Sequence, residues 1–243
     1  MNVFKQIFTI SYSRIIFSFL IIIILVLLSL FIFDILKGPK WSSIIPGLLT
    51  GFVIALFQAL LSWFELIKLD EYNELKIRKI LPNRKDSVYY GDLISKATRE
   101  IKVQGVTAQR FLNDFAQENS KAPEKEKLLL RALEKHVKVK ILVANMNWLD
   151  NSDDKEKADN AERRLKKLSD TYPEYFEYGY YEHYPTHSIV MIDDECIVGP
   201  IFPDVNSRYT PAIHLKQDSQ FAKYYVEYFD SEWNKWYEEK TTN

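Results

Sequence analysis

Two long apolar runs lie near the start of this chain of 243 residues, and strongly polar sequence follows them from about Lys68 onward. The first run covers residues 15–33 and contains only two polar residues, both serines. The second run covers residues 44–67. A helix that crosses a bilayer core of about 30 Å needs about 20 apolar residues. The pattern therefore predicts transmembrane helices over about residues 15–36 and 44–67.

The short segment between the two predicted spans, residues 37–41, contains glycine and proline and cannot hold a domain. The spans are therefore expected to form an antiparallel hairpin that occupies residues 1–68. Lysine and arginine are more frequent outside the hairpin than in its turn, and positive charge is retained on the cytoplasmic side. We therefore expect a multi-pass protein of the cell inner membrane, embedded in the lipid bilayer, with both termini in the cytoplasm.

Small residues recur every four positions in the second predicted span. They are Gly47, Gly51, Ala55 and Ala59, and Gln58 lies beside them. Residues at this spacing line one helix face and allow the backbones of two helices to approach closely. Two interpretations remain open. The stripe packs against the first span within one hairpin, or it packs between protomers of a homo-oligomer that is at least a dimer.

The polar part of the chain predicts a helical neck at residues 69–81 and a globular domain at residues 82–243. Apolar positions at helical spacing predict helices near 89–100, 109–118, 124–136, 155–170 and 221–236. Alternating or β-branched runs predict strands near 101–106, 137–143, 175–181, 188–192 and 196–202. Helices alternate with strands early and strands cluster late. The predicted fold class is therefore α/β, with a mixed sheet covered by helices and carried by the transmembrane hairpin.

Composition excludes several function classes. A formal net charge of −1 does not favour a dedicated nucleic-acid-binding protein. One cysteine allows neither an intramolecular disulfide nor a paired-cysteine metal site. The chain has seven glycines and no glycine-rich phosphate loop, so a Rossmann or P-loop nucleotide fold is not expected. We expect no metal and no cofactor.

The order of elements from Ser87 to Trp236 resembles a phospholipase D-like domain present as a single unit. The resemblance is carried by the segments LLLRALEKHVKVKILVAN and THSIVMIDDECIVGPIF. The motif of that family is H-x-K-x(4)-D, so the resemblance implies that His187 is the nucleophile and that Asp194 orients it. Ile189 occupies the lysine position and supplies no positive charge for a phosphoryl transition state. Ordinary phosphodiesterase activity is therefore not expected, and a two-motif site would require two chains.

A degenerate phosphodiester site can still bind a small anionic or nucleotide ligand. The residues expected to line it are Thr107, Arg110, His187, Arg208, Tyr209 and His214. Other interpretations remain open for three of them. His187 could be a pocket residue, a nucleophile or a structural histidine. His214 lies between apolar neighbours, as a structural histidine would, and Arg110 could serve in a surface ion pair.

Three functions are compatible with these features. The first is a membrane sensor-effector, in which ligand binding to the cytoplasmic domain changes the packing of oligomeric hairpins and disrupts the membrane, as in bacterial antiviral defence. The second is a membrane-anchored phosphodiesterase, a phospholipase or nuclease, that uses His187. The third is a non-enzymatic scaffold that binds another protein. We expect the first.

Overall fold

The computed structural model describes residues 3–32, 41–202 and 205–242. The chain divides into two compact units, Met1–Glu74 and Leu75–Asn243. Residues 37–40 of the predicted hairpin turn (37–41) and the end of the first predicted span, residues 33–36, lie outside the described residues. Each unit is described below by itself.

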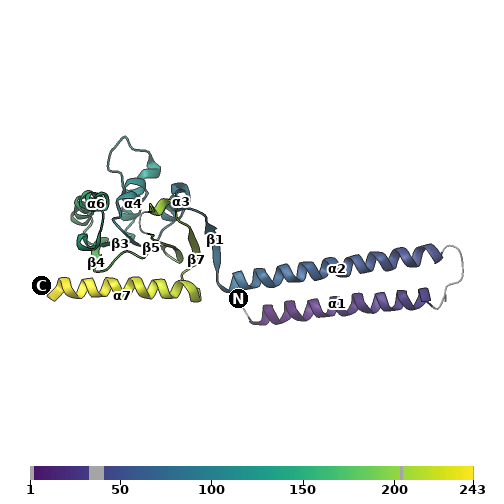
Figure 1. Ribbon diagram of the computed structural model, residues 1–243. Coiled ribbons are helices and arrows are strands. Elements are labelled where there is room, and N and C mark those ends of the chain that lie inside the picture. The colour runs from purple at the N-terminus through teal and green to yellow at the C-terminus, as the bar shows by residue number, and fades with distance from the viewer. Residues whose placement is uncertain (1–2, 33–40, 203–204, 243) are drawn as a thin grey trace. The chain divides into compact units, whose positions relative to one another are not determined.

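The first unit consists of two long helices, α1 (Val3–Ile32) and α2 (Trp41–Glu74), which run side by side in opposite directions (Figure 1). The ring of Phe17 in α1 lies edge-on to Trp63 in α2, with ring centroids 5.8 Å apart. The segment Ile44–Glu65 of α2 is long and apolar enough to cross a membrane, and Phe17–Ile32 of α1 is a shorter apolar helix. The described residues thus contain one candidate span and a shorter apolar helix beside it.

The small-residue stripe of α2 is only partly covered by α1. A Cβ atom added at Gly47 or at Gly51 would meet no atom within 4 Å. Ala55 and Ala59 are half-buried, whereas Gln58 is exposed. Packing within one hairpin therefore does not account for the two glycines, and the part of the stripe that they form is open.

The second helix ends at Glu74, before the end of the helical neck that the sequence predicted. Lys76 adopts a left-handed conformation with φ of 51°, which ends the helical path. Residues Ile77–Leu81 then form strand β1, which pairs antiparallel with β7 (Ala212–Lys216) at one edge of the sheet. Residues 77–81 are therefore part of the α/β unit and not of a helical neck.

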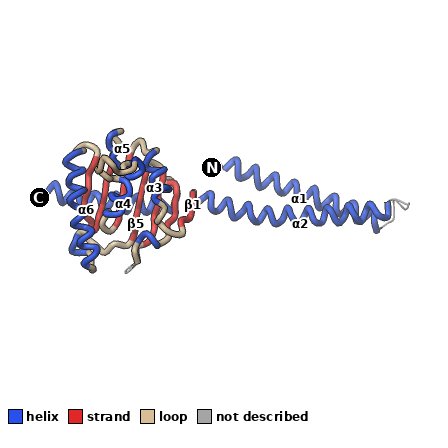
Figure 2. Tube along the Cα trace, turned by 90° about the horizontal axis from the view of Figure 1, so that it is seen from above, coloured by secondary structure: helices blue, strands red, loops and turns tan. Residues whose placement is uncertain are grey.

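The second unit is a mixed α/β fold, as predicted, with a sheet of strands flanked by helices (Figure 2). The sheet has seven strands in the order β1-β7-β6-β5-β2-β3-β4. The remaining strands are β2 (Glu100–Gly105), β3 (Lys138–Ala144), β4 (Phe176–Tyr181), β5 (His187–Ile192) and β6 (Glu195–Pro200). The helices are α3 (Ser87–Ser95), α4 (Gln109–Phe115), α5 (Leu128–Glu134), α6 (Ser152–Thr171) and α7 (Gln220–Thr242). Short 3-10 helices are η1 (Glu124–Glu126), η2 (Met146–Trp148) and η3 (Ser207–Tyr209). Strands β2, β3 and β4 are parallel, and the other pairings are antiparallel.

Helices cover both faces of the sheet and enclose two hydrophobic cores (Figure 1). Helices α3 to α6 lie on one face, where Ile141 of β3 is fully buried. Helix α7 lies on the other face, where Phe229 and Trp233 pack with Leu142 and Ile189. Because side chains alternate along a strand, neighbouring residues such as Ile141 and Leu142 enter different cores. The same alternation decides which polar residues reach the candidate site.

Asp193, in the turn between β5 and β6, holds the start of β2. Its carboxylate accepts hydrogen bonds from the backbone N–H groups of Thr98, Arg99 and Glu100, at 2.8 to 3.1 Å, and from the Thr98 hydroxyl at 2.9 Å. Partial burial alone would raise the pKa of Asp193, but these hydrogen bonds to the charged form lower it below 3.8. The folded state therefore favours the ionised carboxylate.

We predict that Asp193→Asn lowers the free energy of unfolding by about 1–2 kcal/mol at pH 7, because charge-assisted hydrogen bonds become neutral ones in a partly solvated turn. A lowered folded pKa gives stability that is present above the unfolded pKa and is lost as pH falls through the folded pKa. The difference between the variant and the wild type should therefore shrink as the pH is lowered toward about 3.

Urea denaturation of the full chain in detergent micelles, followed by tryptophan fluorescence at the two pH values, measures this difference. The matched control is Asp194→Asn, since Asp194 makes an exposed ion pair with Arg99 and should matter little to stability. An equal loss of stability at pH 7 and near pH 3 would contradict the role assigned to the Asp193 charge.

Candidate functional site

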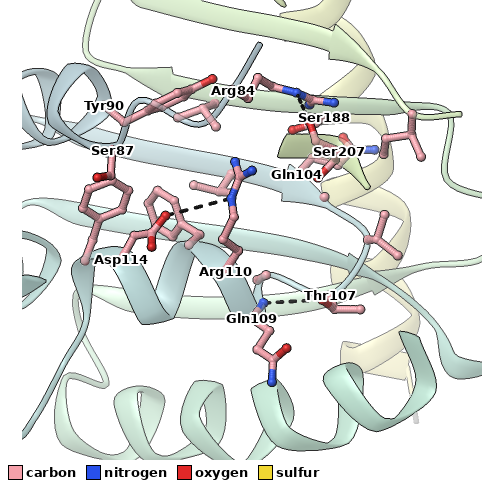
Figure 3. A pocket seen from close by; sticks show the side chains of 18 residues that line it. Arg84, Ser87, Tyr90, Gln104, Thr107, Gln109, Arg110, Asp114, Ser188 and Ser207 are labelled. Carbon is pink, nitrogen blue, oxygen red and sulfur yellow. Dashed lines mark hydrogen bonds and ion pairs between the residues drawn. The ribbon is translucent and has the colours of Figure 1, made fainter. Parts of the chain in front are cut away.

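A polar cavity lies at the edge of the sheet where the parallel strand β2 ends and β5 begins (Figure 3). Ligands of open α/β sheets commonly bind outside the carboxyl ends of parallel strands. This inner cavity has a volume of about 110 Å³ and lies on the side of α3 and α4. Its polar lining includes Arg84, Ser87, Tyr90, Thr107, Arg110, Asp114, Ser188 and Ser207.

Arg84 is held rigidly in the wall of the inner cavity. Its side chain is almost fully buried, with an exposed fraction of 4%. The guanidinium donates from Nε to the Ser207 carbonyl at 2.9 Å and from Nη2 to the Pro200 carbonyl at 2.8 Å and to the Thr210 hydroxyl. All three acceptors are neutral. Burial is the main cause that lowers the pKa of Arg84 to about 10; Tyr90 opposes this change, and the nearby Arg110 contributes to it.

Arg110 points from the first turn of α4 into the inner cavity (Figure 3). Its Nε lies 4.0 Å from Asp114 Oδ2, at the limit of an ion pair. Its Nη1 is buried and has no hydrogen-bond partner. Burial lowers the pKa of Arg110, and the charge of Asp114 opposes this change. A guanidinium nitrogen that is buried without an acceptor is energetically costly, so this atom marks a place where an acceptor is missing.

The charged side chains that line the inner cavity are two arginines and one aspartate. Burial raises the pKa of Tyr90 to about 12, even though both arginines lower it, so the phenol stays protonated and can donate. Burial also raises the pKa of Asp114, whereas Arg110 and Arg208 lower it. Serine hydroxyls at positions 87, 188 and 207 also line the cavity, as do the amides of Gln104, whose buried Oε1 has no hydrogen-bond partner, and Gln109. The cavity thus combines excess positive charge with neutral donors, which suits an oxyanion.

A larger hollow of about 1010 Å³, the outer cleft, adjoins the inner cavity. The two share seven lining residues: Val106, Thr107, Gln109, Arg110, Asp114, Ile201 and Ser207. The outer cleft extends to the start of α6 and to the loop that precedes β5. Arg208 lines it and is exposed, and no ion-pair partner for this side chain exists among the described residues.

The structure brings three of the predicted ligand-binding residues together and separates the others from them. Thr107 and Arg110 line both hollows, and Arg208 lines the outer cleft. Tyr209 lines neither of them, and its exposed ring lies under the Lys85 ammonium group, 4.2 Å from the ring centroid. The role of these four predicted residues in binding a ligand stays a prediction.

His214 is held by protein partners away from both hollows. It is 4% exposed in β7, its Nε2 lies 3.0 Å from Glu195 Oε2, and its Nδ1 lies 2.5 Å from the Tyr89 hydroxyl. Burial lowers the pKa of His214, and the adjacent Glu195 carboxylate opposes this change. These contacts match the structural histidine that the sequence left as an alternative.

His187 lies on the α7 face of the sheet, opposite the inner cavity. Its ring packs edge-on to Tyr225 of α7 at 5.4 Å, and its Nδ1 lies 2.8 Å from the Thr186 hydroxyl. Burial lowers its pKa, and the nearby His183 acts in the same direction. Ser188, the next residue, lines the inner cavity instead. His187 therefore contributes to neither hollow, and its proposed catalytic role stays a prediction.

The other two positions of the H-x-K-x(4)-D motif, Ile189 and Asp194, also lie away from the inner cavity. Ile189 replaces the lysine and is fully buried in the core beneath α7. Asp194 follows the far end of β5 and pairs with Arg99. The pattern of the motif is thus spread along one strand and does not converge on the inner cavity.

Sequence reasoning missed Arg84, Ser87, Tyr90 and Ser188. Arg84 follows a Pro-Asn break and shows no pattern that predicts burial. Asp114 was also missed, although its spacing of four residues from the predicted Arg110 places both on the same helix face and could have indicated it.

Comparison with known proteins assigns no family. No protein-family model and no curated protein matches the chain. Among solved structures, the chain is similar to TrmBL2, an archaeal chromatin protein with a novel mode of DNA binding, at 18% identity and a TM-score of 0.41, over 81% of this chain and 67% of that chain. It is also similar to phosphatidylserine synthase from Haemophilus influenzae Rd KW20 at 11% identity and a TM-score of 0.43, over 65% of this chain and 38% of that chain. Both similarities are low, so neither assigns a family or a function to this chain.

Proposed function

We propose that this chain is a membrane-attached receptor that binds a phosphate-bearing anion in the inner cavity. The observation that carries the proposal is the buried Arg110 Nη1, which has no hydrogen-bond partner. It lies in a cavity whose other arginine, Arg84, has neutral partners only and a pKa lowered to about 10. An anion in this cavity would supply the missing acceptor and the missing negative charge.

The lining favours a tetrahedral oxyanion over a simple halide. Guanidinium groups bind phosphate oxygens through several parallel hydrogen bonds. The hydroxyls of Ser87, Ser188 and Tyr90 add donors from other directions. A volume of about 110 Å³ holds several water molecules, which a phosphate group would replace.

Chain connectivity offers a route from the ligand to the membrane. Arg84 comes three residues after β1, and β1 begins three residues after α2 ends. In this proposal the hairpin crosses the inner membrane twice with both termini in the cytoplasm, and ligand binding alters hairpin packing through β1. Membrane disruption, as in an antiviral effector, is the cellular outcome that the proposal assigns to this change.

The open glycine face of α2 is the proposed contact between protomers. We predict that Gly51→Leu weakens oligomer formation about tenfold, because a large side chain keeps two helix backbones apart. Chemical cross-linking and light scattering of the full chain in detergent micelles measure this effect. Val53→Leu, on an exposed position of the same helix, is the matched control. Equal oligomer content in both variants would count against the glycine contact.

Thermal melting of the full chain in detergent micelles tests the receptor proposal. A ligand that binds only the folded state stabilises it by about 2.7 kcal/mol at a concentration 100 times its Kd. For a unit of this size, inorganic phosphate should raise Tm by about 5–10 °C relative to chloride of equal ionic strength. His187→Ala should show the same rise, since His187 lies on the other face of the sheet. The absence of a rise in the wild type would refute the proposal.

A phosphodiesterase that uses His187 remains the alternative implied by the family resemblance. It predicts hydrolysis of a phosphodiester that His187→Ala abolishes. Ile189, at the motif's lysine position, is buried without a positive charge to offer, so the receptor accounts better for the residues present.

A further inference from the structure

The geometry points to a nucleoside monophosphate as the ligand class, with its phosphate in the inner cavity and its base in the outer cleft. This inference rests on the anion-binding function proposed above. Its starting point is size, because the outer cleft of about 1010 Å³ is far larger than a phosphate group needs. Clefts of this size commonly hold organic ligands. The two hollows adjoin along seven shared lining residues, and we place the two ends of one ligand on either side of them.

An aromatic wall lies in the outer cleft away from the inner cavity. Trp148 and Tyr184 line the outer cleft only, with their rings perpendicular and their centroids 5.2 Å apart. The Trp148 indole is fixed in place, because its Nε1 donates to Glu182 Oε2 at 3.0 Å. Tyr184 is 54% exposed, so its ring offers area to a ligand. A planar base can stack on such a wall, whereas a sugar phosphate lacks an aromatic face.

The two hollows differ in the balance of charges that line them: two arginines and one aspartate line the inner cavity, whereas four aspartates, two arginines and one lysine line the outer cleft. Arg84 and Arg110 line the inner cavity. Asp150 and Asp153 line only the outer cleft, and Asp150 has no ion-pair partner among the described residues. Of the two cations that line only the outer cleft, Lys157 is paired with Asp153 and with Asp154, and Arg208 has no ion-pair partner among the described residues. Negative charge at this end can accept hydrogen bonds from ribose hydroxyls or base amino groups, and it opposes a second cluster of phosphates.

This polarity separates the nucleoside monophosphate from other phosphate-bearing molecules. A polyanion such as a nucleic acid or a cyclic oligonucleotide would place phosphates next to Asp150 and Asp153, where like charges repel. An inorganic phosphate or a sugar phosphate would fill the inner cavity and leave the aromatic wall unused. A nucleoside monophosphate matches all three features: the arginines of the inner cavity, the aromatic wall and the carboxylates of the outer cleft.

Equilibrium titration of the full chain in detergent micelles with AMP, GMP, ribose 5-phosphate and inorganic phosphate tests the inference. Base stacking is worth about 1–3 kcal/mol, and each 1.4 kcal/mol is a factor of ten. At least one of the two nucleotides should therefore bind about 5- to 100-fold more tightly than ribose 5-phosphate. Tyr184→Ala should remove most of this advantage and leave the affinity for ribose 5-phosphate within about twofold.

The matched control is Tyr224→Ala, a 69% exposed tyrosine on α7, which should change no affinity. If phosphate and ribose 5-phosphate bind but neither nucleotide binds more tightly, the ligand class is wrong and the receptor proposal stands. If none of the four compounds binds, the receptor proposal itself fails. A nucleotide that binds equally well to Arg110→Ala occupies another site, and that result also overturns the inference.

Discussion

Arg110→Ala is expected to weaken phosphate binding by about 30- to 150-fold, which corresponds to about 2–3 kcal/mol. The guanidinium of Arg110 is the group whose buried Nη1 lacks an acceptor, and Asp114, its nearest carboxylate, lies 4.0 Å from Nε. The substitution deletes the cavity guanidinium that has a nitrogen without a hydrogen-bond partner. Fold stability should change little or increase, since burial of this charge is costly in the unliganded protein.

Equilibrium dialysis of radiolabelled phosphate with the full chain in detergent micelles measures this loss. Arg163→Ala is the matched control, because Arg163 is exposed on α6 and pairs with Asp159. Arg110→Lys should fall between the wild type and the alanine variant, since it keeps the charge and loses the planar fork. Phosphate affinity that is equal in Arg110→Ala and Arg163→Ala would show that the anion binds elsewhere.

Arg84→Ala is expected to lower the free energy of unfolding by about 3 kcal/mol, and Tm by about 6–12 °C. The substitution removes the donor for the carbonyls of Ser207 and Pro200 and leaves space in a buried region. The segment between β6 and β7 would then lose its main attachment to the residues that follow β1. Phosphate should no longer stabilise this variant, because the cavity wall is lost.

Urea denaturation compared with Lys85→Ala isolates this effect, since Lys85 is the exposed neighbour in the same segment. Arg84→Met provides a further test. A well-packed apolar residue can replace a buried charge without loss of stability. A stable Arg84→Met variant that fails to bind phosphate would show that the buried charge serves the ligand. An Arg84→Ala variant as stable as Lys85→Ala would contradict the structural role.

The elements with strong local patterns could be predicted from the sequence. The β-branched alternation before Ala144 predicted β3, and the aromatic periodicity after Phe221 predicted α7. Strand β1 could not be predicted, because the helical pattern of α2 continues into its residues and only pairing with β7 makes it a strand. The left-handed backbone at Lys76 is the local feature that ends the helix. Lysine is not a residue type that indicates this conformation in a sequence.

The candidate site could be predicted only in part, because successive residues of a strand point to opposite faces of the sheet. Thr107 and Arg110 follow β2 directly, so their position near the sheet edge could be inferred. On β5 both faces are apolar, and the sequence does not tell which face bears the cavity. A shift of one residue exchanges the faces, and it is Ser188, not His187, that lines the inner cavity. Arg84 reaches the cavity from a distant segment through tertiary contacts that no local pattern encodes.

The most direct test of anion binding in the inner cavity is a calorimetric titration of inorganic phosphate into the full chain in detergent micelles. We predict saturable binding of one phosphate per chain, with a Kd of about 10 μM to 1 mM, that Arg110→Ala removes and His187→Ala leaves intact. No saturable heat, or binding that survives in Arg110→Ala, would contradict the assignment of the cavity as an anion site.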